Sequence, residues 1–148
     1  MSRMMFVNLP VADLARSRAF LEALGAVNEP KFTDETAACM KLSDSIFVMI
    51  LTHAKFTQFT PRPIADATAG SEVILCLSAE SRESVDSTVQ RAVAAGGSAD
   101  PAAKQDYGVM YGRSVADPDG HIWEIMWMDP AAAEQGSGAI DTAVPQEA

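Results

Sequence analysis

The chain has 148 residues, of which 48% are hydrophobic, so it has the size and composition of one folded domain. Its net charge of −9 at pH 7 argues against nucleic acid as a partner and leaves a neutral or cationic small molecule as a compatible ligand. No apolar run approaches the roughly 20 residues that span a bilayer, and the N-terminus does not resemble a signal peptide. We therefore expect a cytoplasmic protein that does not enter the membrane.

Only two cysteines occur, Cys39 and Cys76, and each is isolated in the sequence. This excludes a disulfide framework and a cysteine-based zinc cluster, and both are expected to be buried free thiols. Part of the negative charge lies at the C-terminal end, where four acidic residues follow Met128 with no Lys or Arg.

The N-terminal half begins with a β-rich stretch, Met4–Val11, after which Asp13 is a suitable helix N-cap. Leucines at positions 14, 21 and 24, with Phe20 beside them, predict a helix that Gly25 ends. Weaker strands follow, and residues 41–44 lead into the strongly apolar strand 45–51.

The same order returns in the C-terminal half. Residues 72–77 (EVILCL) predict a strand, Ser81 a helix N-cap, and valines 85, 89 and 93 an apolar helical stripe that ends before Gly96. Residues 112–117 then lead into the strand 121–128 (HIWEIMWM). The chain is therefore predicted to be an α+β domain made of two strand–helix–strands repeats, spanning residues 4–51 and 71–129. A ferredoxin-like sandwich would need further helices within 26–51 or 98–128, where no helical stripe occurs.

Two segments lie outside the repeats. Residues 52–70 form a linker broken by Pro61 and Pro63, in which 53–59 can form a helical turn or two. Residues 131–148 are rich in Ala, Gly, Ser and Gln, and we expect a mostly disordered tail after a domain that ends at residue 130.

A turn and a strand near the C-terminus carry the strongest chemical signal. Asp117-Pro118-Asp119-Gly120 predicts a tight turn, and the strand after it alternates between two faces. Glu124 is the one ionisable group on its face, with Ile122, Met126 and Met128. Two interpretations are open: a solvated glutamate on an exposed sheet, or a carboxylate that faces a pocket as a metal ligand or base.

The segments YGRSVADPDGHIWEIMWMD and NLPVADLARSRAFLEALG resemble the vicinal oxygen chelate (VOC) superfamily, which includes glyoxalase I, bleomycin-resistance proteins and extradiol dioxygenases. The resemblance covers residues 4 to about 129. It implies two βαβββ modules that form a curved half-barrel sheet around a cleft.

The resemblance also implies one divalent metal (Zn, Ni, Mn or Fe), bound through the first and last strands of each module. The matching positions carry Glu72 and Glu124 in the second module, as metal ligands and catalytic residues, but Phe6 and either Val48 or Met49 in the first. Apolar groups cannot coordinate a metal, so a metal-free protein is the alternative.

Histidine does not complete a catalytic metal site in this reading. A catalytic zinc takes about three protein ligands, and an Fe(II) oxygenase takes two histidines and a carboxylate. His53 follows the last strand of the first module, and His121 is predicted to point away from the face of Glu124.

In the metal-free interpretation, Glu72 and Glu124 lie close together in a cleft, where one acts as a base or both attract a cation. The predicted cleft is lined by Phe6, Asn8, Ile74, Ile122 and Met126. Tyr107 and Tyr111 supply a hydroxyl or an aromatic wall. Arg113 either clamps a substrate carboxylate or pairs with Asp117 or Asp119.

Two functions of different classes follow from this. One is a metal-dependent lyase, isomerase or dioxygenase that uses Glu72 and Glu124. The other is a metal-free binding protein of the bleomycin-resistance type. A homodimer is expected in either case, because the resemblance implies it and the end of the last strand (MWMD) suits an apolar interface.

Overall fold

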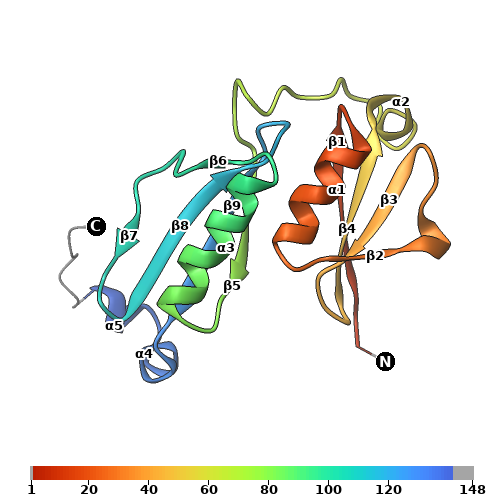
Figure 1. The fold of residues 1–148 in the computed structure, drawn as a ribbon. Coiled ribbons are helices and arrows are strands. Elements are labelled where there is room, and N and C mark those ends of the chain that lie inside the picture. The colour runs from red at the N-terminus through yellow and green to blue at the C-terminus, as the bar shows by residue number, and fades with distance from the viewer. Residues whose placement is uncertain (1, 142–148) are drawn as a thin grey trace. The chain divides into compact units, whose positions relative to one another are not determined.

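A computed structural model describes residues 2–141, which divide into two compact units. The first unit runs to Gly70 and includes the turn Pro118–Gly120, and the second contains Ser71–Asp117 and resumes at His121. Each unit has one mixed sheet with a long helix on one face (Figure 1). The predicted α+β class and the two βαβββ modules are thus confirmed, while the joining of the sheets around a cleft stays a prediction.

The first unit has the strand order β1-β4-β3-β2, in which β1 is parallel to β4 and the other pairs are antiparallel. Helix α1 begins where the Asp13 side chain accepts a hydrogen bond from the Arg16 N–H, and it ends before Gly25, whose φ of 103° suits glycine. The elements are β1 (Met5–Val11), α1 (Leu14–Ala23), β2 (Val27–Glu29), the 3-10 helix η1 (Pro30–Phe32), β3 (Ala37–Lys41), β4 (Ile46–Thr52) and α2 (His53–Phe56).

The second unit repeats this arrangement with the order β5-β9-β8-β6, and a short extra strand, β7, also pairs with β8. Strand β5 is parallel to β9, and Ser81 caps the helix by accepting from the Ser84 N–H. The elements are β5 (Ile74–Ser78), α3 (Arg82–Ala94), β6 (Ser98–Ala99), β7 (Gln105–Asp106), β8 (Met110–Ala116), β9 (Ile122–Met128), α4 (Pro130–Gln135) and α5 (Ser137–Asp141).

Each long helix buries one stripe against its sheet. Helix α1 buries Phe20 and Leu21, and α3 buries Val85, Val89 and Ala92. The predicted stripe of three valines is wrong at its end, because Val93 is 40% exposed. Ala92 continues the stripe instead, since a helix turns every 3.6 residues and the inward positions drift from strict i+4 spacing.

Two predicted boundaries change. The first strand of the second module begins at Ile74 rather than at residue 72. Residues 131–141 of the predicted tail contribute to α4 and α5, in which Ala132 is 4% exposed, and the rest of that tail lies outside the described residues. The helical turn expected after residue 52 is confirmed as α2, and between β8 and β9 there is only a turn, which excludes the ferredoxin-like alternative.

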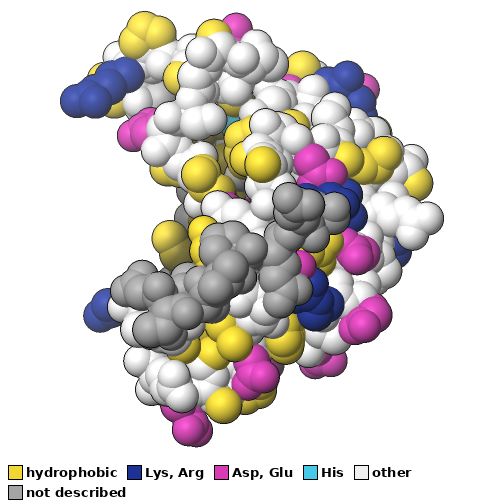
Figure 2. All heavy atoms as spheres, turned by 90° about the vertical axis from the view of Figure 1, so that its left-hand side faces the viewer, with side chains coloured by type: hydrophobic (Ala, Val, Ile, Leu, Met, Phe, Trp, Pro, Cys, Tyr) yellow, Lys and Arg dark blue, Asp and Glu magenta, His cyan; other side chains and the backbone are white. Residues whose placement is uncertain are grey.

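Among the helices of residues 2–141, none combines the length and hydropathy needed to cross a membrane. Basic side chains lie next to acidic ones on the molecular face seen in Figure 2, and they do not gather into a patch there.

Candidate functional site

The second sheet has one carboxylate on its distal face, by which we mean the sheet face opposite the long helix of the unit. Trp123 and Ile125 are 1% and 2% exposed on the side of α3, so the even-numbered residues of β9 point the other way. Glu124 is half-buried there between Ile122 and Met126. Its antiparallel partner is Ser114, and Ile74, which pairs with Ile122, is 59% exposed. The predicted alternation therefore places a carboxylate in an apolar setting.

The parallel partner of Glu124 is Cys76, a residue that sequence reasoning did not select. The Cys76 side chain is exposed, against the expectation of a buried thiol, whereas Cys39 is buried as expected. Partial burial, and then the nearby Glu124, raise the pKa of the Cys76 thiol. Spacing from the helix would have found this residue, because Cys76 lies five residues before the N-cap Ser81, as Asn8 lies five before Asp13.

Glu72 does not lie beside Glu124. It occupies an exposed bend before β5, four residues from Cys76, which is about 13 Å along an extended chain. The expected pair of close carboxylates therefore does not form in the second unit. The prediction that Glu72 lies beside Glu124 is wrong because the EVILCL pattern indicates a strand but does not determine its register. That register is set by pairing with a strand about fifty residues away.

The equivalent positions of the first unit carry no ionisable group. Asn8 pairs with Met49, and Met49 rather than Val48 is the distal-face residue, since Val48 is 1% exposed on the side of α1. Phe6 pairs with Phe47, and their rings stack with centroids 4.8 Å apart and planes inclined by 12°. Phe6 remains 47% exposed, so one aromatic surface of this unit is accessible within the described chain.

Two predicted cleft residues face α3 instead. The Tyr111 hydroxyl donates to Asp86 at 2.6 Å, and burial followed by this bond raises the pKa of Tyr111 to about 12. Arg113 donates through Nε and Nη2 to Asp100 at 3.0 and 2.7 Å, and through Nη1 to Asp86. Arg113 is therefore a structural residue whose partners are not the predicted Asp117 or Asp119.

The same side of the sheet holds a second arginine, Arg82, which forms an ion pair with Asp106 and lies 4.5 Å from the ring centroid of Tyr111. Tyr107, the other tyrosine predicted to line a cleft, is half-buried in the turn between β7 and β8, where its N–H donates to the Met110 carbonyl.

The Asp-Pro-Asp-Gly turn has a structural role in this fold. Asp117 is buried and accepts from the His121 N–H and from Trp123 Nε1. The Asp119 carboxylate accepts from the Ala12 N–H at 2.8 Å and from the Ser17 hydroxyl at 3.1 Å, at the start of α1. His53 begins α2 in the first unit, and His121 directly precedes β9 in the second.

The residues present do not fit a catalytic divalent metal. Within the second unit, Glu124 has only the Cys76 thiol as a neighbouring donor on the paired strand, and a raised thiol pKa disfavours the thiolate that metals need. Asn8 and Met49 offer an amide and a thioether. No cluster of three His, Cys, Asp or Glu side chains occurs in the part of the chain that the structure describes.

Known proteins share this fold. The profile of the family described as bleomycin resistance protein-like N-terminal matches residues 3–43. A glyoxalase-related enzyme from Fulvimarina pelagi is 21% identical with a TM-score of 0.73, covering 100% of this chain and 99% of that one. A hypothetical protein from S. aureus is 24% identical with a TM-score of 0.71, covering 86% and 94%. A glyoxalase/bleomycin resistance protein/dioxygenase family enzyme from Burkholderia phytofirmans is 18% identical with a TM-score of 0.69, covering 86% and 99%. No curated protein matches the chain.

The chain thus has the fold of the vicinal oxygen chelate superfamily, as the resemblance of its two segments predicts. In sequence, residues 3–43, which contain the first strand and the first helix, are similar to the family described as bleomycin resistance protein-like N-terminal.

Proposed function

We propose that the protein binds a small organic molecule, cationic or neutral, at the distal face of the second sheet and that it needs no divalent metal for this. The observation that carries the proposal is the single carboxylate of Glu124 among exposed or half-buried apolar side chains. Small-molecule sites typically combine an apolar surface with a few polar groups that orient the ligand. Here Ile74, Ile122 and Met126 supply the surface.

The charge of the protein favours a cationic ligand over an anionic one. The chain carries 20 acidic and 11 basic residues, and the register places no Lys or Arg beside Glu124 on β5, β8 or β9 of the second unit's distal face. A carboxylate that is half-buried next to apolar groups attracts a cation more strongly than one in open water. An amine or amidine group on the ligand is the natural partner.

The metal-dependent lyase, isomerase or dioxygenase that the sequence leaves open lacks support from the donor set. Glu72, its second carboxylate, lies outside β5. Binding of the bleomycin-resistance type requires no such ligands, and the N-terminal match is to that type. The proposal includes a homodimer, as the resemblance implies, which light scattering of the purified protein would test.

Calorimetric titration with cationic aromatic amines, each matched to a neutral analogue, tests this function. Binding is expected to persist in excess chelator and to prefer the amine. Glu124→Gln should weaken amine binding about tenfold, whereas Glu134→Gln, at an exposed glutamate of α4, should leave it unchanged. Near-stoichiometric Zn, Ni, Mn or Fe that survives dialysis and is lost in Glu124→Ala would overturn the proposal, as would equal amine binding by both variants.

A further inference from the structure

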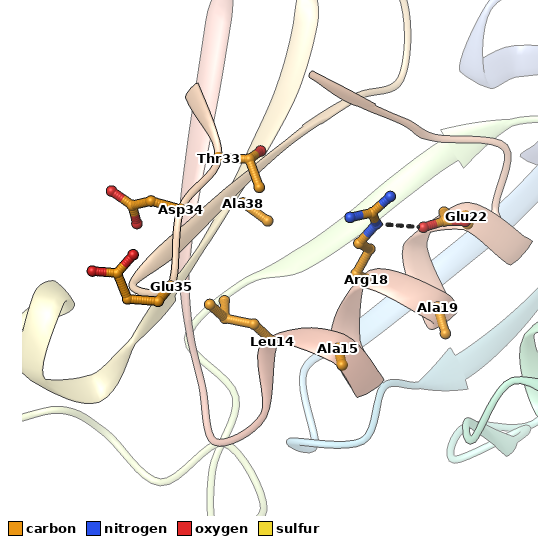
Figure 3. A pocket seen from close by; sticks show the side chains of 9 residues that line it. All are labelled: Leu14, Ala15, Arg18, Ala19, Glu22, Thr33, Asp34, Glu35 and Ala38. Carbon is orange, nitrogen blue, oxygen red and sulfur yellow. Dashed lines mark hydrogen bonds and ion pairs between the residues drawn. The ribbon is translucent and has the colours of Figure 1, made fainter. Parts of the chain in front are cut away.

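A separate hollow lies in the first unit, between α1 and the loop that follows η1 (Figure 3). Its volume is about 650 Å³, within the range of sites that hold small ligands. All of its lining residues belong to the first unit, so it is independent of Glu124. The lining residues are Leu14, Ala15, Arg18, Ala19 and Glu22 of α1, and Thr33, Asp34, Glu35 and Ala38 opposite them.

Small side chains of α1 contribute to the lining of the hollow. The α1 residues recur at i, i+1, i+4, i+5 and i+8, which places them along one side of the helix. Ala15 and Ala19 are exposed on α1, and Ala38 of β3 is a buried lining residue with 3% of its surface exposed. These side chains end at Cβ, so Ala15 and Ala19 offer a ligand apolar contact without a polar group.

The wall opposite α1 is held in place by hydrogen bonds. The Thr33 hydroxyl donates to the Glu29 carbonyl at 2.8 Å and accepts from the Cys39 N–H. The Asp34 carboxylate accepts from the hydroxyl and N–H of Thr36 and from the Ala37 N–H. A ligand would therefore meet a formed wall and would lose little affinity to ordering it.

The charges around the hollow sum to an acidic rim. Arg18 donates through Nε to Glu22 at 2.7 Å, so this ion pair adds no net charge to the rim. Asp34 and Glu35 remain, and the hydrogen bond from the Thr36 side chain leads the causes that lower the pKa of Asp34, so this carboxylate is charged at neutral pH. Lys55 of α2 also lowers the pKa of Asp34, and its effect is the weakest of those causes.

We propose that this hollow binds a small amphipathic organic cation, with its hydrocarbon body on Leu14, Ala15 and Ala19 and its ammonium group beside Asp34 and Glu35. An inorganic cation would have only the electrostatic attraction of the carboxylates, and a neutral hydrocarbon would have only the contact with apolar side chains. The combination of both selects a primary amine on a short apolar chain.

Titration of ¹⁵N-labelled protein with hexylamine, followed by NMR, tests this proposal. Saturable shifts are expected in the amides of α1 and of residues 33–38, with weaker binding of hexanol and none of hexanoate. Equal binding of hexylamine and hexanol would overturn the assignment of a cation. Shifts spread over acidic residues of both units, without saturation, would overturn the site.

Variants locate the ligand in the hollow. Ala19→Trp, at an exposed helix position, should fill it and weaken hexylamine binding at least about tenfold, while Ala94→Trp on the exposed side of α3 is the matched control. Glu35→Gln should weaken binding roughly threefold at low salt, and Glu80→Gln should not. Unchanged binding in Ala19→Trp contradicts the proposal. The amine titration at Glu124 can fail without affecting this result, because the two sites share no residue.

Discussion

The two modules have the same order of strands and helix but hold their helices in different ways. In the first unit, α1 packs through Phe20 and Leu21, and its charged pair, Arg18 with Glu22, stays in solvent. In the second unit, the interface of α3 with the sheet includes Asp86, Tyr111 and Arg113 in one hydrogen-bonded network. Polar groups thus enter the interface between helix and sheet only where each of them has a partner.

The distal faces of the two sheets differ in the side chains they carry. At the equivalent strand positions the first unit has Asn8 with Met49, and the second has Cys76 with Glu124. These side chains point away from the helices, so they are free to vary without disturbing the core. The comparison teaches that the modules share their packing pattern and differ in the chemistry of the residues that packing does not constrain.

The largest effect is expected from breaking the network of the second unit. Arg113→Ala leaves Asp100 and Asp86 without their guanidinium, and we expect the free energy of unfolding to fall by about 3 kcal/mol. The matched change in the first unit, Arg18→Ala, removes a pair whose side chains are 45% and 48% exposed and should cost less than about 1 kcal/mol. Urea unfolding followed by circular dichroism measures both. Equal losses would contradict the contrast between the two helix interfaces.

A smaller effect is expected at the helix N-termini. Asp119→Ala removes the acceptor for the Ala12 N–H and the Ser17 hydroxyl and should lower stability by about 1.5 kcal/mol. Ser81→Ala removes one bond at the start of α3 and should cost about 1 kcal/mol. The same unfolding measurement compares them. If Asp119→Ala were neutral, the role of the Asp-Pro-Asp-Gly turn in holding α1 would be wrong.

A loss of stability is also expected at alkaline pH. The pKa of Tyr111 is about 12 in the folded protein against an ordinary value of 10.0, so the neutral hydroxyl is favoured by folding. Its stabilisation is complete below pH 10 and declines as pH rises from there through about 12. The stability difference between the wild type and Tyr111→Phe should therefore shrink across this window. A constant difference in unfolding free energy would show that the hydroxyl is not protected by burial and Asp86.

Much of the fold follows from short patterns in the sequence. Asp13 and Ser81 cap helices as their spacing predicts, the turn at 117–120 forms, and β9 alternates so that Glu124 faces away from α3. Each of these features depends on residues a few positions apart, where the period of a helix or strand controls which side chains share a face. Family resemblance is also readable in short segments, namely the first strand and helix of the first module and the turn and last strands of the second.

The composition of the site required the pairing of distant strands. Cys76 rather than Glu72 lies beside Glu124, and Arg113 and Tyr111 meet Asp86 across the face that α3 covers. A shift of one residue in register moves every side chain of a strand to the other face, and local periodicity is the same before and after such a shift. Neighbouring residues therefore determine helix, strand and turn. The register in which distant strands pair determines which side chains lie together and can act together.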